Sequence, residues 1–303
     1  MSLSIKTPLL ESLPLSQLNG TKVLMKMEAA QPSGSFKIRG IGYACEQHVA
    51  RGAHRFISSS GGNAGLAVAY AGRRLNVPVV VVVPETTSER ARHLLRLEGA
   101  EVIVHGASWA EANELALSLK TARDAFLHPF DDPLVWHGHS SMIDEVVVEG
   151  VRPDAVILSV GGGGLLAGVD EGLRRNGLDG VPIYAAETEG MASFHAALKA
   201  GGPVELPALT GVATTLGARQ VCQRAFDLAQ KRPVVSVLVS DREAVESCKA
   251  FLDDHRTLVE PACGASLALL YGRKIAVGSL QNVLVIVCGG STATVDSLNS
   301  LRG

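Results

Sequence analysis

Aliphatic runs that alternate with amphipathic segments restrict the fold of this chain more than any other feature of its sequence. The clearest run is the five valines of 79–83, bracketed by Pro78 and Pro84, and similar runs occupy 154–160 and 282–287. Strands that are apolar on both faces are typical of parallel sheets covered by helices on each side. The pattern therefore predicts an α/β fold of open, mostly parallel, twisted sheets flanked by helices.

Periodicity and punctuation give the expected order of elements. Strands are expected near 54–58, 79–83, 101–104, 125–128, 154–160, 181–186, 234–239 and 282–287. Helices are expected over 64–75, 87–98, 108–122, 137–149, 164–175, 241–253, 262–275 and 292–301, with another after Lys37. Capping boxes are expected for Thr86 with Glu89 and for Ser240 with Glu243.

Composition bounds the possible partners and the compartment. The formal charge is −2 and no basic run is present, which argues against a nucleic-acid partner. No apolar run approaches the roughly 20 residues that span a bilayer, so no membrane partner is expected. The five cysteines are scattered without C-x-x-C pairing, as in a reducing compartment. These features predict a cytoplasmic enzyme.

Lys37 is the strongest single candidate for chemistry. It lies among small residues in the stretch 33–40 and precedes apolar residues at helical spacing, namely Ile38, Ile41 and Cys45. Ser33 or Ser35 is expected to cap that helix, whose dipole would lower the pKa of the amine. A neutral lysine amine is what Schiff-base chemistry requires. A surface lysine beside a turn is the alternative reading of the same residues.

Two glycine-rich segments follow predicted strands and precede predicted helices. Residues 59–65 read Ser-Ser-Gly-Gly-Asn-Ala-Gly, and residues 161–165 read Gly-Gly-Gly-Gly-Leu. Free backbone N–H groups at such junctions are natural seats for a carboxylate or a phosphate. The second segment lacks the Lys-Ser/Thr of a Walker loop, and a tight structural turn would explain four glycines equally well.

Six motifs in order along the chain resemble the fold-type II pyridoxal-phosphate enzymes, and most closely the liver-type L-serine/L-threonine dehydratases. They are Gln31-Pro-Ser-Gly-Ser-Phe-Lys-Ile-Arg-Gly40, Ser59 to Gly65, Pro129-Phe-Asp-Asp-Pro133, Ser159-Val-Gly-Gly-Gly-Gly-Leu165, Glu260-Pro-Ala-Cys-Gly-Ala265 and Val287-Cys-Gly-Gly-Ser291. The resemblance implies two sheets, as in the tryptophan synthase β-chain. It implies a large pyridoxal-phosphate-binding domain of 1–40 and 139–303, and a small domain of 41–138.

The same resemblance implies the residues that bind pyridoxal 5′-phosphate. Lys37 would hold the cofactor covalently and act as the catalytic base. Phe36 and Thr215 would flank its ring, Asn63 would bind the ring oxygen and Cys288 would lie beside the pyridine nitrogen. The cofactor phosphate would receive the N–H groups of the second glycine segment, comprising Gly161, Gly162, Gly163, Gly164 and Leu165.

The implied substrate is a small amino acid. Its carboxylate would be held by Ser60, Gly61, Asn63 and Ala64. The implied reaction is dehydration and deamination of L-serine to pyruvate and ammonia, and of L-threonine to 2-oxobutyrate and ammonia. Related racemases carry a serine where this chain has Gly61, so glycine favours the dehydratase. A racemase, a β-replacement synthase or a cofactor-binding homologue of low activity remain alternatives.

Two further expectations come from the resemblance alone. Glu187, with carbonyl groups around Met191, Leu216 and Ala218, matches a site for a monovalent cation such as K+. A glutamate that caps a strand end is the alternative. The family also implies a homodimer. The sequence does not rank serine against threonine, because one methyl group changes binding by only about 1–3 kcal/mol.

Overall fold

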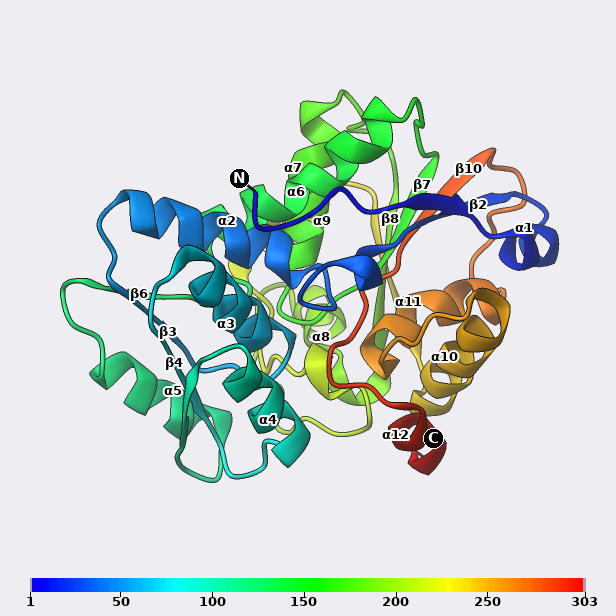
Figure 1. Cartoon of the computed structure of the whole chain (residues 1–303). Coiled ribbons are helices and arrows are strands. Elements are labelled where there is room, and N and C mark those ends of the chain that lie inside the picture. Colours follow the sequence, from blue (N-terminus) through cyan, green and yellow to red (C-terminus); the bar gives the residue numbers. More distant parts are fainter. Residues whose placement is uncertain (1, 302–303) are drawn as a thin grey trace.

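The computed structural model describes residues 2–301 and contains two sheets that lie side by side (Figure 1). The six-stranded sheet has the order β1 (Leu9–Glu11), β2 (Lys22–Lys26), β10 (Asn282–Ile286), β7 (Ala155–Ser159), β8 (Ile183–Thr188) and β9 (Val234–Val239). The four-stranded sheet has the order β5 (Glu101–Val104), β4 (Val79–Val83), β3 (Arg55–Ser58) and β6 (Asp124–Phe126). All neighbours pair in parallel except β1 with β2. The predicted fold class is confirmed.

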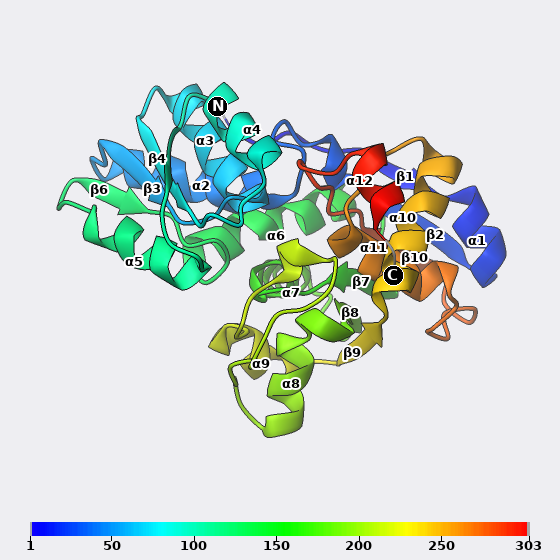
Figure 2. The same ribbon diagram turned by 90° about the horizontal axis from the view of Figure 1, so that it is seen from below.

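Helices cover both sheets, as the apolar strands require. They are α1 (Leu13–Asn19), α2 (Lys37–Ala50), α3 (Asn63–Leu75), α4 (Glu89–Leu97), α5 (Trp109–Ser118), α6 (Pro133–Val148), α7 (Gly164–Arg175), α8 (Ser193–Ala200), α9 (Gln223–Ala229), α10 (Asp241–His255), α11 (Pro261–Tyr271) and α12 (Val295–Ser300). Three short 3₁₀ turns are η1 (Glu28–Ala30), η2 (Glu189–Met191) and η3 (Thr214–Leu216). The view from below separates the helices around the two sheets (Figure 2).

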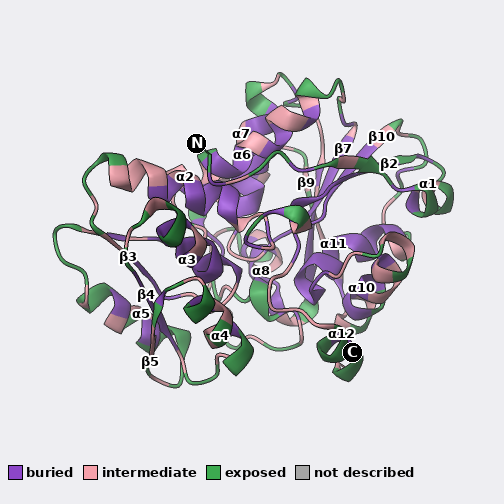
Figure 3. Ribbon diagram, in the orientation of Figure 1, coloured by how far each residue is buried: buried purple, intermediate pink, exposed green. Residues whose placement is uncertain are grey.

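Buried residues lie along both sheets and the helices beside them (Figure 3), and their side chains form distinct cores. On one face of the four-stranded sheet, Ala112 and Ala116 of α5 pack against Ile57 and Val82. On the other face, α2, α3 and α4 supply the apolar residues. The six-stranded sheet has one large core, to which α6, α7, α10 and α11 contribute. Helices α2 and α6 join the two regions.

Glycines let α2, α6 and α7 approach closely. A Cβ on Gly138 of α6 would overlap the carbonyl of Arg39 in α2, and one on Gly168 of α7 would lie 2.7 Å from the carbonyl oxygen of Trp136 in α6. Side chains at these positions would force the helices apart. The close packing fixes the start of α2, which carries Lys37, against the large core.

Several boundaries differ from the sequence-based expectations. Strands β1 and β2 and helices α1, α8 and α9 were not expected, because they are short or contain buried polar residues. The Ser240–Glu243 capping box is confirmed. The Thr86 box is wrong, since Ser88 caps α4 by accepting from Ala91 N–H. A serine cap for α2 is also wrong, because Phe36 occupies the N-cap position and makes no side-chain hydrogen bond.

The structure bears on two expectations from the sequence, one about a membrane-spanning segment and one about the cysteines. Within residues 2–301, no helix is both long and apolar enough to cross a bilayer. All five cysteines are free and buried.

Candidate active site

The start of α2 is tied to the end of β10, where the cofactor-binding residues were expected. The Phe36 N–H donates to the Cys288 carbonyl at 3.1 Å, and Ser35 bridges Gly289. Lys37 is the first residue of the helix. Phe36, Lys37 and Cys288 were predicted to belong to one site, and the structure places them next to one another.

The Lys37 amine is held in a partly buried position. Its Nζ donates to the Pro129 carbonyl oxygen at 2.6 Å and lies 5.3 Å from the centre of the Phe36 ring. Burial lowers the pKa of Lys37 to about 8, and the nearby Cys288 and Glu260 limit that fall. An amine with this pKa is partly neutral near physiological pH and is available as a nucleophile or a base.

The second glycine segment forms a cradle at the start of α7. The N–H groups of residues 161–165 donate no hydrogen bond within residues 2–301. A Cβ on Gly162 would overlap the Phe130 ring, and one on Gly161 would lie 2.8 Å from the Leu216 carbonyl oxygen. Gly163 has φ +93°, which favours glycine. The five free N–H groups at a helix start make an anion seat.

The first glycine segment forms a similar seat at the start of α3. The N–H groups of residues 61–65 also donate no hydrogen bond within the described part of the chain, while the Ser60 N–H lies 3.3 Å from Ser58 Oγ. Gly65 approaches the Ser60 carbonyl so closely that no Cβ fits there. The predicted residues 60, 61, 63 and 64 therefore lie in one turn whose free N–H groups suit a carboxylate.

Asn63 connects the four-stranded side of the site to the six-stranded side. Its Nδ2 donates to Glu260 Oε1 at 2.6 Å, and its Oδ1 accepts from the Ser291 N–H at 3.0 Å. The Thr215 hydroxyl donates to the same Glu260 oxygen at 2.6 Å. The structure thus brings Asn63 and Thr215, which the sequence assigned to the site separately, onto one carboxylate.

Cys288 and Phe36 are neighbours of Lys37 whose own surroundings are well defined. A hydrogen bond with Cys263 and burial raise the pKa of Cys288 well above its usual value, so the thiol is neutral. The Phe36 ring packs against His139, with ring centres 4.9 Å apart. His139 accepts from the Gly40 N–H through Nδ1 at 3.1 Å, which replaces the serine cap expected for α2.

Three of the four residues expected at a cation site, Met191, Leu216 and Ala218, lie near one another. Met191 Sδ would be 3.6 Å from a Cβ on Gly217, which separates Leu216 from Ala218. Glu187 accepts the N–H groups of Phe194 and His195, both at 2.8 Å, and so caps the start of α8. Burial raises the pKa of Glu187 to about 8.

Sequence reasoning missed four residues of the site. Pro129, Phe130, Glu260 and Ser291 all belong to motifs that were recognised, yet none was given a role. An acidic residue before a proline, as in Glu260-Pro261, also fits an ordinary helix start, and Glu260 does occupy the N-cap of α11. Only its contacts with Asn63 and Thr215, both far away in the sequence, distinguish it.

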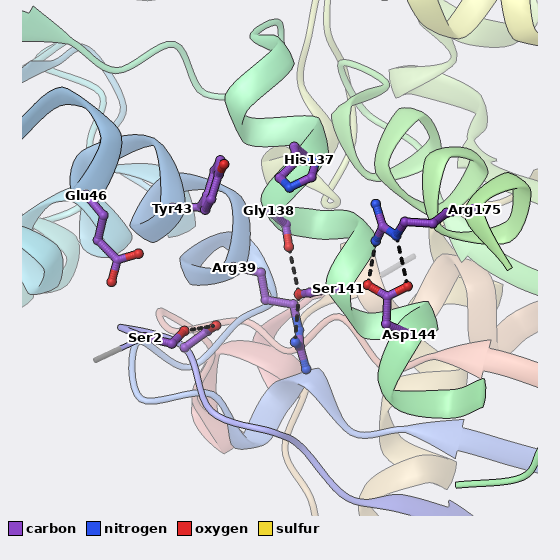
Figure 4. A pocket seen from close by; sticks show the side chains of 10 residues that line it. Ser2, Arg39, Tyr43, Glu46, His137, Gly138, Ser141, Asp144 and Arg175 are labelled. Carbon is purple, nitrogen blue, oxygen red and sulfur yellow. Dashed lines mark hydrogen bonds and ion pairs between the residues drawn. The ribbon is translucent and has the colours of Figure 1, made fainter. Parts of the chain in front are cut away.

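A separate hollow of about 400 Å³ opens between α2, α6 and α7 (Figure 4). Its lining includes Tyr43, His137, Asp144 and Arg175, and Lys37 is not among the lining residues. Arg175 is paired with Asp144 there. This hollow is distinct from the Lys37 site.

Comparison with known proteins defines the class of this fold and site. The family model described as "Pyridoxal-phosphate dependent enzyme" matches residues 2–289. The mouse L-serine dehydratase/L-threonine deaminase is 47% identical, over 99% of this chain and 95% of the relative. A mouse protein named serine dehydratase-like is 50% identical, over 98% and 93%. An L-serine ammonia-lyase from Rhizomucor miehei has a structure with TM-score 0.94 and 37% identity, covering 99% of this chain and 98% of that one.

The chain belongs to the family of pyridoxal-phosphate-dependent enzymes, of fold type II. The resemblance inferred from six motifs is confirmed. The residues present fit the cofactor: the site offers a lysine amine of lowered pKa, a neutral thiol and two helix starts with free N–H groups. One seat suits the cofactor phosphate and the other a substrate carboxylate.

Proposed function

We propose that this chain is an L-serine and L-threonine ammonia-lyase, which dehydrates and deaminates L-serine to pyruvate and L-threonine to 2-oxobutyrate. The observation that carries the proposal is the Lys37 amine, with its pKa lowered to about 8, bonded to the Pro129 carbonyl oxygen beside the glycine cradle at the start of α7. The names of the mouse relative and of the fungal structure support this reaction. When bound, pyridoxal phosphate supplies an electron sink that acidifies the α-C–H bond of an attached amino acid.

We assign separate binding and proton-transfer roles to residues of the chain. We assign the cofactor phosphate to the N–H groups of residues 161–165 and the substrate carboxylate to the turn of residues 60–64. Lys37 holds the cofactor and removes the α-proton through Nζ. Cys288 presents a neutral thiol, which would leave an adjacent pyridine nitrogen without a proton. Phe36 and Thr215 would flank the ring, and Asn63 would bind its ring oxygen.

Gly61 favours elimination over racemisation. A racemase must return a proton to the second face of the α-carbon, and glycine has no acid to provide it. Elimination needs a base on one face only. The surroundings also resist a serine there, since a Cβ on Gly61 would lie 2.7 Å from Thr87 Cγ2 and 3.2 Å from Val83 Cγ1.

The test is release of pyruvate from L-serine and of 2-oxobutyrate from L-threonine, measured with added pyridoxal phosphate. The product mixture is also analysed for D-serine. We expect Lys37→Ala to abolish 2-oxo acid release and the exposed control Lys120→Ala to retain it. D-serine as the main product would instead assign the chain to the racemases.

The remaining expectations are proposals about organisation. The large domain would comprise 1–40 and 139–303 and the small domain 41–138, in keeping with the separate cores around the two sheets. A homodimer is supported by exposed leucines near edge strand β1, at Leu10, Leu13 and Leu18. Light scattering after gel filtration measures the molar mass in solution and so distinguishes a dimer from a monomer.

Two proposals concern the environment of the chain. Five buried free thiols support a reducing compartment such as the cytoplasm. A monovalent cation such as K+ is proposed beside Glu187, with carbonyl groups from Met191, Leu216 and Ala218. The proximity of Met191 to residues 216–218 supports the cation, as does the buried Glu187 carboxylate, which has no salt bridge within residues 2–301.

A further inference from the structure

Glu260 is a buried carboxylate for which the proposed reaction has no use. It is 7% exposed and lies at the N-cap of α11, where its backbone N–H approaches the Gly289 carbonyl oxygen at 3.3 Å. Buried carboxylates are costly unless they accept hydrogen bonds or meet a positive charge. Its surroundings therefore indicate what it does.

Both donors to Glu260 come from distant parts of the fold. Asn63 is the first residue of α3, beside the four-stranded sheet, and Thr215 belongs to η3, beside the six-stranded sheet. Each donates to Oε1 at 2.6 Å. One oxygen atom thus joins the two segments, which also approach at Gly62, where an added Cβ would lie 3.7 Å from the Thr215 methyl group.

The Glu260 side chain is itself fixed in place. Gly290 has φ +148°, and a Cβ there would lie 2.6–2.7 Å from three carbons of the Glu260 side chain. The next residue, Ser291, donates its N–H to Asn63 Oδ1 at 3.0 Å and its hydroxyl to the Ser33 carbonyl. The amide of Asn63 is therefore held at both ends, and one of its two N–H hydrogens remains free for another acceptor.

We propose that Glu260 is a positioning residue that latches the start of α3 to η3 across the active site and orients the Asn63 amide toward the cofactor ring. The role rests on the proposed function, because the value of the latch is to keep Asn63, Thr215 and the carboxylate seat in register. Burial raises the pKa of Glu260 to about 7, and the Thr215 and Asn63 hydrogen bonds and Lys37 limit that rise. A protonated Glu260 still offers a carbonyl oxygen to both donors.

Two substitutions separate hydrogen-bond acceptance from volume. Glu260→Gln keeps an amide oxygen that can accept from both donors, whereas Glu260→Met fills a similar volume and accepts nothing useful. Asp170→Asn is the matched control, since Asp170 is a buried carboxylate of the large core that pairs with Arg232, far from these contacts. Hydrogen exchange of the amides at residues 66–69, where the hydrogen-bonded N–H groups of α3 begin, is measured first in the cofactor-free protein. The dissociation constant for pyridoxal phosphate is measured next.

We expect Glu260→Met to speed exchange at residues 66–69 about tenfold or more and to weaken cofactor binding by a similar factor, as loss of a bond to a charged acceptor implies. Glu260→Gln should stay within about threefold of the parent in both. If Glu260→Met does not fold, hydrogen exchange is measured instead for the amides of residues 216–218 in Thr215→Val. Faster exchange there supports the latch, and unchanged exchange contradicts it.

Three results would overturn the latch. One is unchanged exchange at 66–69 in Glu260→Met, the second is a Gln variant as damaged as the Met variant, and the third is an equal effect of Asp170→Asn. Because exchange is measured without cofactor or substrate, it does not depend on which reaction the enzyme catalyses. If the Met and Gln variants show the expected exchange but the parent releases no 2-oxo acid, the proposed function is refuted and the latch is still supported.

Discussion

Lys37 Nζ donates a hydrogen bond to the carbonyl oxygen of Pro129 at 2.6 Å, which connects the amine to the cradle that begins α7. The next residue, Phe130, packs its ring against Gly162 and its carbonyl against Gly164. The position of the amine therefore depends on glycines 125 or more residues further along the chain.

Gly162→Ala tests that dependence. The new Cβ would overlap the Phe130 ring, so the 129–130 segment must move and carry the Lys37 acceptor with it. We expect a loss of about 1–3 kcal/mol in stability and a cofactor affinity at least about tenfold weaker. Gly180→Ala is the control, because nothing lies within 4 Å of its Cβ. Cofactor titration of both variants makes the comparison, and equal affinities would contradict the link.

A buried ionic network fixes the start of α2 from its other side. Arg39 is 2% exposed and donates to both oxygens of Glu28 and both oxygens of Glu145, at 2.7–2.8 Å. Lys26 is fully buried and pairs with Glu145 at 2.5 Å. Three of these charged side chains, Lys26, Glu28 and Arg39, are thus buried, and Glu145 is partly buried beside them.

Removing one member should leave an uncompensated buried charge. We expect Glu28→Ala to lower the free energy of unfolding by about 3–5 kcal/mol. The control Glu149→Ala breaks the more exposed pair with Lys6 and should cost no more than about 1 kcal/mol. Urea denaturation of both variants measures the difference, and similar losses would show that the network has no special role.

Gly61→Ser should be destabilising because of Thr87. The added Cβ would meet Thr87 Cγ2 at 2.7 Å and Oγ1 at 3.0 Å, which implies a cost of about 1–3 kcal/mol. Thr87→Ala removes both atoms, so the double variant should recover most of that loss. A double-mutant cycle by chemical denaturation measures the coupling. Strict additivity would mean that Thr87 does not limit the size of residue 61.

The Glu187 pocket predicts a pH-dependent response to K+. Burial raises the folded-state pKa from its usual 4.5 to about 8, so the stability that protonated Glu187 contributes is lost as pH rises through about 8. A bound cation would offset the buried negative charge. We expect K+, compared with tetramethylammonium, to raise the Tm more at pH 9 than at pH 6. Glu187→Gln should remove this difference, and a K+ effect independent of pH would contradict the site.

Local signals in the sequence were sufficient for most of the fold and for the parts of the site that adjoin in sequence. The valines of β4 mark a buried strand by themselves, and the glycines of 161–164 mark the turn into α7. Strand β2 was not predicted, because it begins and ends with a lysine, Lys22 and Lys26. The buried charge of Lys26 is compensated by Glu145 in α6. Helix α1 was not predicted, because its seven residues are too few to show a helical period.

Contacts between distant segments account for what the sequence could not supply. The serines before Lys37 looked like caps, yet His139 from α6 accepts the Gly40 N–H instead. Glu260 and Asn63 are 197 residues apart, and no periodicity or capping rule joins them. Such pairs are decided by packing of the whole chain rather than by local preference.

Borohydride reduction of the protein with bound pyridoxal phosphate, followed by peptide mapping, tests the central claim most directly. We expect the reduced cofactor on the peptide that contains Lys37, and none on the Lys37→Ala variant. A folded protein saturated with cofactor that shows no modified peptide, or modification at another lysine, would contradict it.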